Sequence, residues 1–228
     1  IRDPLWSRGL GDVYKRQALI SLYLYFPIFC FVKEVTVEGN KLVPKDEIIK
    51  TSELVGKILA IHNKEDSTKR ILNIKLIKNI SFKQINLTKI KIVVEEKKII
   101  MSAKIGNITG YIDQDSIFLR NIEEYIDESY PILSLDSEDK IKDGVFLLNL
   151  LVKKGALETK EISEIVFDEI LGVTIFTTQG VEIYLGEDKF EKKISNLIII
   201  LKDNKTKQMN ESYIDVSNIN KGVVNYNL

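Results

Sequence analysis

Alternation of apolar and polar side chains marks two stretches in the first half of the chain. Val35 and Val37 alternate with charged or hydroxyl-bearing neighbours in residues 33–38, and a longer alternation runs through 89–96. A period of two residues is typical of a strand with one buried face. The pattern therefore predicts strands over both ranges, and a further strand over 80–85.

The spacing of apolar residues between these strands changes to that of helices. Pro44 is followed by Asp46 and Glu47, and both residue types suit the first turn of a helix. Ser67 is a candidate N-cap for a second helix. Apolar residues at helical spacing follow it: Ile71, Leu72 and Leu76. The predicted order in residues 33–99 is strand, helix, helix, strand, strand.

From residue 100 onward, short strands are predicted to alternate with two helices, so the fold class is α+β. Two apolar segments, 110–112 and 117–119, are joined by polar turn residues and predict a hairpin. A helix over 139–154 ends at Gly155 as its C-cap, with Val145, Leu148, Leu151 and Val152 facing the core. Further strands are predicted over 162–167, 173–177, 181–185, 213–216 and 223–226. A helix over 189–201 places Ile194, Leu197, Ile198 and Leu201 on the sheet, with Lys192 and Lys193 on its solvated face.

An uncharged apolar run covers residues 18–32. It is shorter than the roughly 20 residues that a membrane-spanning helix needs, so it fits either a buried core helix or the remnant of a truncated transmembrane helix. Its aromatic residues are typical of a membrane interface and favour the second interpretation. Lys33 would then mark the point where the chain leaves the membrane.

Residues 1–17 are interpreted as a translated sequencing adapter, because Ser7 to Gln17 back-translates to a transposon end used in library preparation. The alternative is a basic cytosolic tail. The whole chain has 33 basic and 33 acidic residues, and residues 1–17 hold four of the former and two of the latter. The remainder has 29 basic against 31 acidic residues, a balance that argues against nucleic-acid binding.

Few residues in the sequence could support catalysis. There is one cysteine, Cys30, and one histidine, His62, so neither a disulfide nor a familiar nucleophile arrangement is predicted, and His62 is expected to be exposed in a loop. Asp113 and Asp115 are too few for a metal site. A hydrolase with a carboxylate pair is the one enzyme class that the residue types leave open. No cofactor is predicted.

Several strings resemble the FtsQ/DivIB family of bacterial cell-division proteins. VKEVTVEGNKLVPKDEII and KIKIVVEEKKIIMSAK resemble the ends of its POTRA domain, and the hairpin YIDQDSIFL, the segment Tyr130 to Leu133 and the string YIDV at 213–216 resemble its following β domain. The resemblance implies a POTRA domain over 33–99, with βααββ order, and a β domain over 100–228. It also implies a single-pass protein of the cytoplasmic membrane, with most of the chain outside the cytoplasm at the division septum.

The resemblance further implies a scaffold that is not an enzyme and binds no small molecule. Its expected partners are FtsB/DivIC and FtsL, and through them the septal peptidoglycan synthase. Binding is expected at the free edge of the last strands, because an unpaired edge can accept a strand from a partner. The candidate residues are Tyr213, Lys221, Val223, Val224, Asn225 and Tyr226. Tyr226 is the expected anchor, while Val223 and Val224 could instead complete the core.

Two alternatives stay open at this point. The same POTRA order occurs in adaptors for envelope protein export, which gene neighbourhood would distinguish. A hydrolase of cell-wall metabolism is the other, and turnover of purified peptidoglycan would reveal it.

Overall fold

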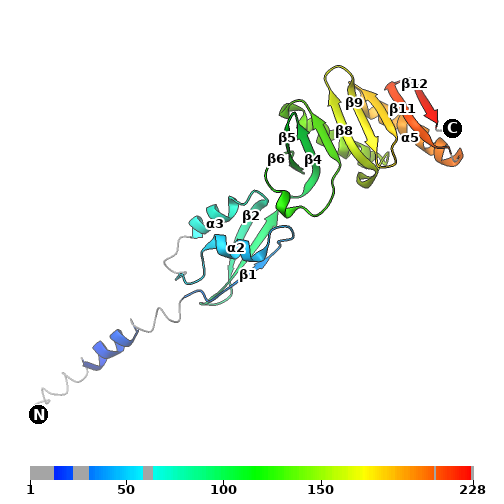
Figure 1. Ribbon diagram of the computed structural model, residues 1–228. Coiled ribbons are helices and arrows are strands. Elements are labelled where there is room, and N and C mark those ends of the chain that lie inside the picture. Colours follow the sequence, from blue (N-terminus) through cyan, green and yellow to red (C-terminus); the bar gives the residue numbers. More distant parts are fainter. Residues whose placement is uncertain (1–12, 23–30, 59–63, 208, 227–228) are drawn as a thin grey trace, which may run out of the picture. The chain divides into compact units, whose positions relative to one another are not determined.

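The computed structural model describes residues 13–22, 31–58, 64–207 and 209–226. The chain divides into two compact units, Ile1–Lys97 and Lys98–Leu228, which are described one at a time (Figure 1). Both units combine helices with a β-sheet, which confirms the α+β class.

Residues 13–22 form an exposed helix that crosses the boundary predicted at residue 17. In the parts of the chain that the structure describes, no helix is long and apolar enough to cross a membrane. Residues 23–30, including Cys30, lie outside the described residues. Val32, the last residue of the apolar run, is 1% exposed and its N–H donates to Lys57 O at 2.9 Å. The end of that run is therefore part of the first unit.

The first unit contains a three-stranded sheet made of β1 (Glu34–Glu38), β2 (Ile77–Gln84) and β3 (Lys89–Glu96) in the order β1-β3-β2. β1 runs parallel to β3, and β2 runs antiparallel to it. Ile90, Ile92 and Val94 of the central strand are buried. The alternation read from the sequence thus identified the buried face of β3, and the predicted order of the five elements is observed.

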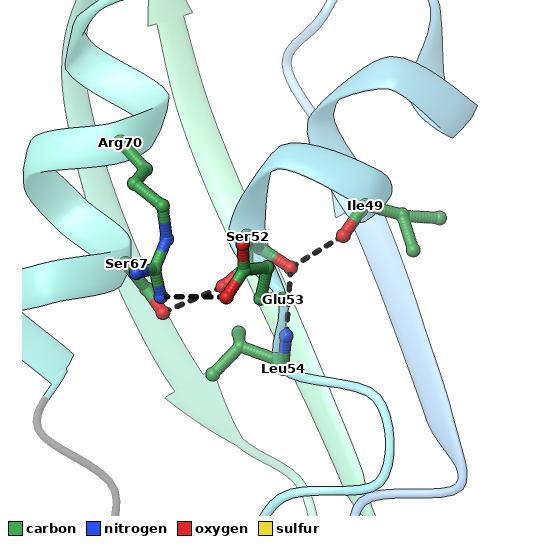
Figure 2. A network of polar contacts seen from close by, with 6 residues as sticks. All are labelled: Ile49, Ser52, Glu53, Leu54, Ser67 and Arg70. Carbon is green, nitrogen blue, oxygen red and sulfur yellow. Dashed lines mark hydrogen bonds and ion pairs between the residues drawn. The ribbon is translucent and has the colours of Figure 1, made fainter.

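Helices α2 (Lys45–Ser52) and α3 (Lys64–Leu72) are joined by the polar network of Figure 2. Ser67 was predicted as an N-cap, but α3 begins three residues earlier, so that prediction was wrong. The Ser67 side chain is buried within the helix, and its hydroxyl donates to Ser52 O at 2.7 Å. A hydroxyl can serve a tertiary hydrogen bond as well as a cap, and local sequence does not distinguish the two. Leu76, predicted in the same helix, lies after its end and is buried just before β2.

The second unit contains a nine-stranded sheet whose order is β12-β11-β10-β9-β8-β7-β4-β5-β6. Its strands are β4 (Ile99–Ile105), β5 (Ile108–Asp113), β6 (Phe118–Leu119), β7 (Ile132–Leu135), β8 (Ile162–Asp168), β9 (Gly172–Thr177), β10 (Glu182–Gly186), β11 (Glu211–Asn218) and β12 (Lys221–Tyr226). The hairpin of β5 and β6 is confirmed. β7 pairs in parallel with both β4 and β8 and so joins the two halves of the sheet.

One row of buried side chains crosses this sheet from strand to strand. The register places in one line Val224, Ile214, Ile183, Ile175, Ile165, Leu133 and Ala103. All belong to the apolar core or pack against it. Since successive side chains of a strand point to opposite faces, this row defines the core face of the sheet.

Two helices contribute to the same core, α4 (Ile141–Lys154) and α5 (Phe190–Lys207). α4 ends at Gly155, whose φ of 68° is left-handed, as predicted for a C-cap. Val152 was expected to face inward but is exposed, because the buried stripe of α4 passes through its neighbours Leu150 and Leu151. Lys193 was expected on a solvated face but is 3% exposed, with its ammonium 3.5 Å from Asp188 Oδ1.

Candidate functional site

The last strand of the chain, β12, lies at one end of the nine-stranded sheet (Figure 1). It pairs antiparallel with β11, from Asn218 opposite Lys221 to Glu211 opposite Tyr226. On its other side no strand pairs with it in the part of the chain that the structure describes. Outward-pointing N–H and C=O groups of such a strand are available to another chain.

One face of β12 lies against α5. Val224 pairs with the buried Ile214 and packs against the core, and a Cβ on Gly222 would come 2.6 Å from Ile200 Cδ1. The Tyr226 hydroxyl donates to Asn204 Oδ1 at 2.9 Å. Val224 and Tyr226 therefore make contacts within their own unit, although 38% of the Tyr226 surface stays exposed.

The other face of β12 carries Val223 and Asn225, both exposed. Tyr213, which the sequence grouped with the edge, lies one strand inward on β11 and is opposite Asn225. Burial raises the pKa of the Tyr213 phenol, and the negative charges of Asp215 and Glu182 raise it further. Lys221 lies at the start of β12 next to the β11–β12 turn. The structure thus brings five of the six predicted residues together on one strand.

Asn204 of α5 was not predicted and belongs to this region. It is 2% exposed, and its Nδ2 group is buried without a hydrogen-bond partner within the described residues. The predicted helix stopped at residue 201, whereas α5 continues to Lys207. Asn204 follows the inward residues Leu197 and Leu201 at helical spacing, so a longer helix would have placed it on the core face.

Replacing Tyr226 by phenylalanine is expected to lower the free energy of unfolding by about 1 kcal/mol, because the Asn204 carbonyl then loses its donor in a buried position. Chemical denaturation of the full chain measures this change. In a double-mutant cycle with Asn204→Ala the two effects should be clearly non-additive. Strictly additive effects would contradict a direct contact between the two side chains.

Asp113 has a structural role in the turn that follows β5. Asp113 is fully buried, and its Oδ1 accepts N–H groups from Asp115 and Ile117, both at 2.9 Å. This arrangement closes the β5–β6 turn. Among the described residues, no three His, Cys, Asp or Glu side chains are grouped so that they could hold a metal ion. His62 lies outside the described residues.

Comparison with known proteins supports the family likeness. The family model described as "Cell division protein FtsQ/DivIB, C-terminal" matches residues 103–217, which run from within β4 into β11. The cell division protein DivIB of Clostridium botulinum strain Loch Maree is 27% identical over 225 residues, covering 90% of this chain and 85% of that protein. The cell division protein FtsQ of Geobacter sp. strain M21 is 26% identical over 126 residues, covering 50% of this chain and 46% of that protein.

These matches place the chain among cell-division proteins, and the family model lies within its second unit. More narrowly, the chain belongs to the FtsQ/DivIB family.

Proposed function

We propose that this protein is a non-enzymatic scaffold of the division apparatus that binds FtsB/DivIC and FtsL outside the cytoplasmic membrane. Through these partners it would help to regulate septal peptidoglycan synthesis. The observation that carries the proposal is the free outer edge of β12, at the end of a nine-stranded sheet. Membership of the FtsQ/DivIB family supports the division role.

The proposed mechanism is addition of a partner strand to β12. A strand at this position would satisfy the outward backbone groups, and its alternate side chains would contact the two faces next to Val223 and Val224. The edge suits this use because β12 is six residues long and contains no proline. Its β-branched pair at the centre favours an extended backbone.

The first unit is proposed to be a POTRA domain. Its strand, helix, helix, strand, strand order and its parallel β1–β3 pair support this assignment. We also propose that the apolar run before it is the remnant of a single membrane anchor, which would hold both units on the outer side of the membrane at the septum.

Paired proline substitutions test the edge. In an edge strand, successive N–H groups point alternately toward the neighbouring strand, here β11, and outward. Of the two variants Val223→Pro and Val224→Pro, one therefore removes an N–H group that faces β11 and the other removes an outward N–H group. The variant that keeps the melting temperature is the one that has lost an outward donor. We expect that variant to bind the extracytoplasmic segment of the co-encoded FtsB/DivIC protein about tenfold more weakly or worse, which isothermal titration calorimetry with the full chain measures.

The matched control is Val223→Thr, which keeps the N–H group and the branched side chain and should leave the affinity nearly unchanged. Binding that survives in a folded proline variant would place the interface elsewhere on the protein.

A further inference from the structure

The face of the sheet opposite α4 and α5 has an ordered set of side chains near the β12 edge. Two transverse rows follow from the strand register. One contains Asn225, Tyr213, Glu182, Phe176 and Glu164, and the other contains Val223, Asp215, Tyr184, Thr174 and Val166. Phe176 and Val223 are exposed, at 37% and 45%. We call this surface the open face.

The open face is acidic and aromatic near its free edge. Its two rows contain three acidic residues, Glu164, Glu182 and Asp215. The one basic residue within strands β8 to β12, all of which the structure describes, is Lys221 at the turn end of β12.

Two of these carboxylates lack a cation. Asp215 Oδ1 accepts the N–H of Ser217 at 2.8 Å, but neither Asp215 nor Glu182 forms an ion pair with any described residue. They lie on either side of Tyr213 in the register, since Glu182 is opposite Tyr213 on β10 and Asp215 is two residues along β11. Negative charge is thus concentrated within two strands of the free edge.

We propose that the strand accepted by β12 is amphipathic, with lysine or arginine side chains over the open face and apolar side chains over the α5 face. This inference rests on the proposed addition of a strand to β12 and adds the chemistry by which the partner is recognised. On the α5 face a new strand would continue the apolar row that ends at Val224. On the open face its side chains would lie next to Val223 and Asn225 of β12, with Asp215 and Tyr213 on the following strand, β11.

The distances suit long basic side chains. Neighbouring strands are about 4.8 Å apart, so a new strand would lie about 10 Å from β11. A lysine or arginine side chain can lie over the short Val223 and approach the Asp215 carboxylate. The ring of Tyr213 on β11 offers a cation–π contact to the same groups. An acidic partner side chain that reached over Val223 in the same way would be repelled by the negative charge of Asp215.

The test neutralises the two unpaired carboxylates without changing their size. The double variant Glu182→Gln/Asp215→Asn keeps an oxygen to accept the Ser217 N–H. We expect the Kd of the full chain for the extracytoplasmic segment of the co-encoded FtsB/DivIC protein to rise about threefold to tenfold at about 50 mM salt. The salt dependence of the Kd should also become flatter.

A matched control is Glu123→Gln/Glu124→Gln, which changes the net charge equally after β6, at the opposite end of the sheet. This control should leave the Kd within about twofold, since charges beyond a Debye length are screened. If the proline variant abolishes binding but the open-face variant binds like the unmodified chain, the amphipathic partner strand is wrong and the edge mechanism stands. If the open-face variant weakens binding while the proline variants do not, the partner lies on the sheet face and both proposals fail.

Discussion

Replacing Gly39 by alanine is expected to destabilise the first unit by about 3 kcal/mol. Gly39 has a φ of +92°, and a Cβ atom there would lie 2.1 Å from Val94 O. A left-handed backbone alone costs an L-residue about 1–2 kcal/mol. The overlap adds to this cost, because the carbonyl belongs to the central strand β3 and cannot retreat without disturbing the pairing of β1 and β2 with that strand. Thermal unfolding and hydrogen exchange of the full chain measure the effect.

Gly56→Ala is the matched control for this substitution. Gly56 also has a positive φ, +79°, but nothing lies within 4 Å of an added Cβ. We expect it to cost about 1 kcal/mol, the backbone strain without the overlap. Exchange protection in β10 and β11 should be the same in both variants, since these strands belong to the second unit. Equal losses from the two substitutions would show that the contact with Val94 does not matter.

Replacing Ile183 by alanine is expected to destabilise the second unit by about 3–4 kcal/mol. Ile183 of β10 is fully buried and lies in the middle of the row between Ile175 and Ile214. Its truncation leaves a cavity where β9, β10 and β11 meet, and the surrounding sheet can close only part of it. Urea denaturation monitored by circular dichroism gives the free energy.

Ile132→Ala provides the comparison within the same sheet. Ile132 of β7 is 40% exposed on the open face, so the same change of side chain should cost less than about 1 kcal/mol. The difference between the two isoleucines measures burial directly. Loss of stability at Ile132 equal to that at Ile183 would mean that another part of the protein covers the open face.

Ile183 and Ile132 lie on opposite faces of the sheet, and the two faces have different roles in the proposed binding. Strand addition at β12 would require β11 and β10 to hold that strand in place, and the buried row packs the three strands together. Recognition of the partner is proposed to depend on the opposite face, where Asp215 and Glu182 lie. One strand, β11, thus carries both kinds of residue in alternation, with Ile214 inward and Tyr213 outward.

Much of the local structure could be predicted from short-range patterns. The alternation of Ile90, Ile92 and Val94 depends on residues two apart in one strand, and it identified β3 and its buried face correctly. Gly155 likewise ends α4 through its own backbone conformation. Ser67 was misassigned because its partner, Ser52 O, belongs to another helix.

The sequence by itself determined the element types of both units, the family likeness and the strand on which the candidate site lies. Only the tertiary structure decided the order of the nine strands, the burial of Asn204 under Tyr226, and the approach of Glu182 to Tyr213 across β10 and β11. The physical reason is the distance along the chain over which each interaction acts. Side-chain periodicity reports which face of one element is buried, whereas the chemistry of a sheet face depends on pairings between strands that lie about 30 residues apart in the chain.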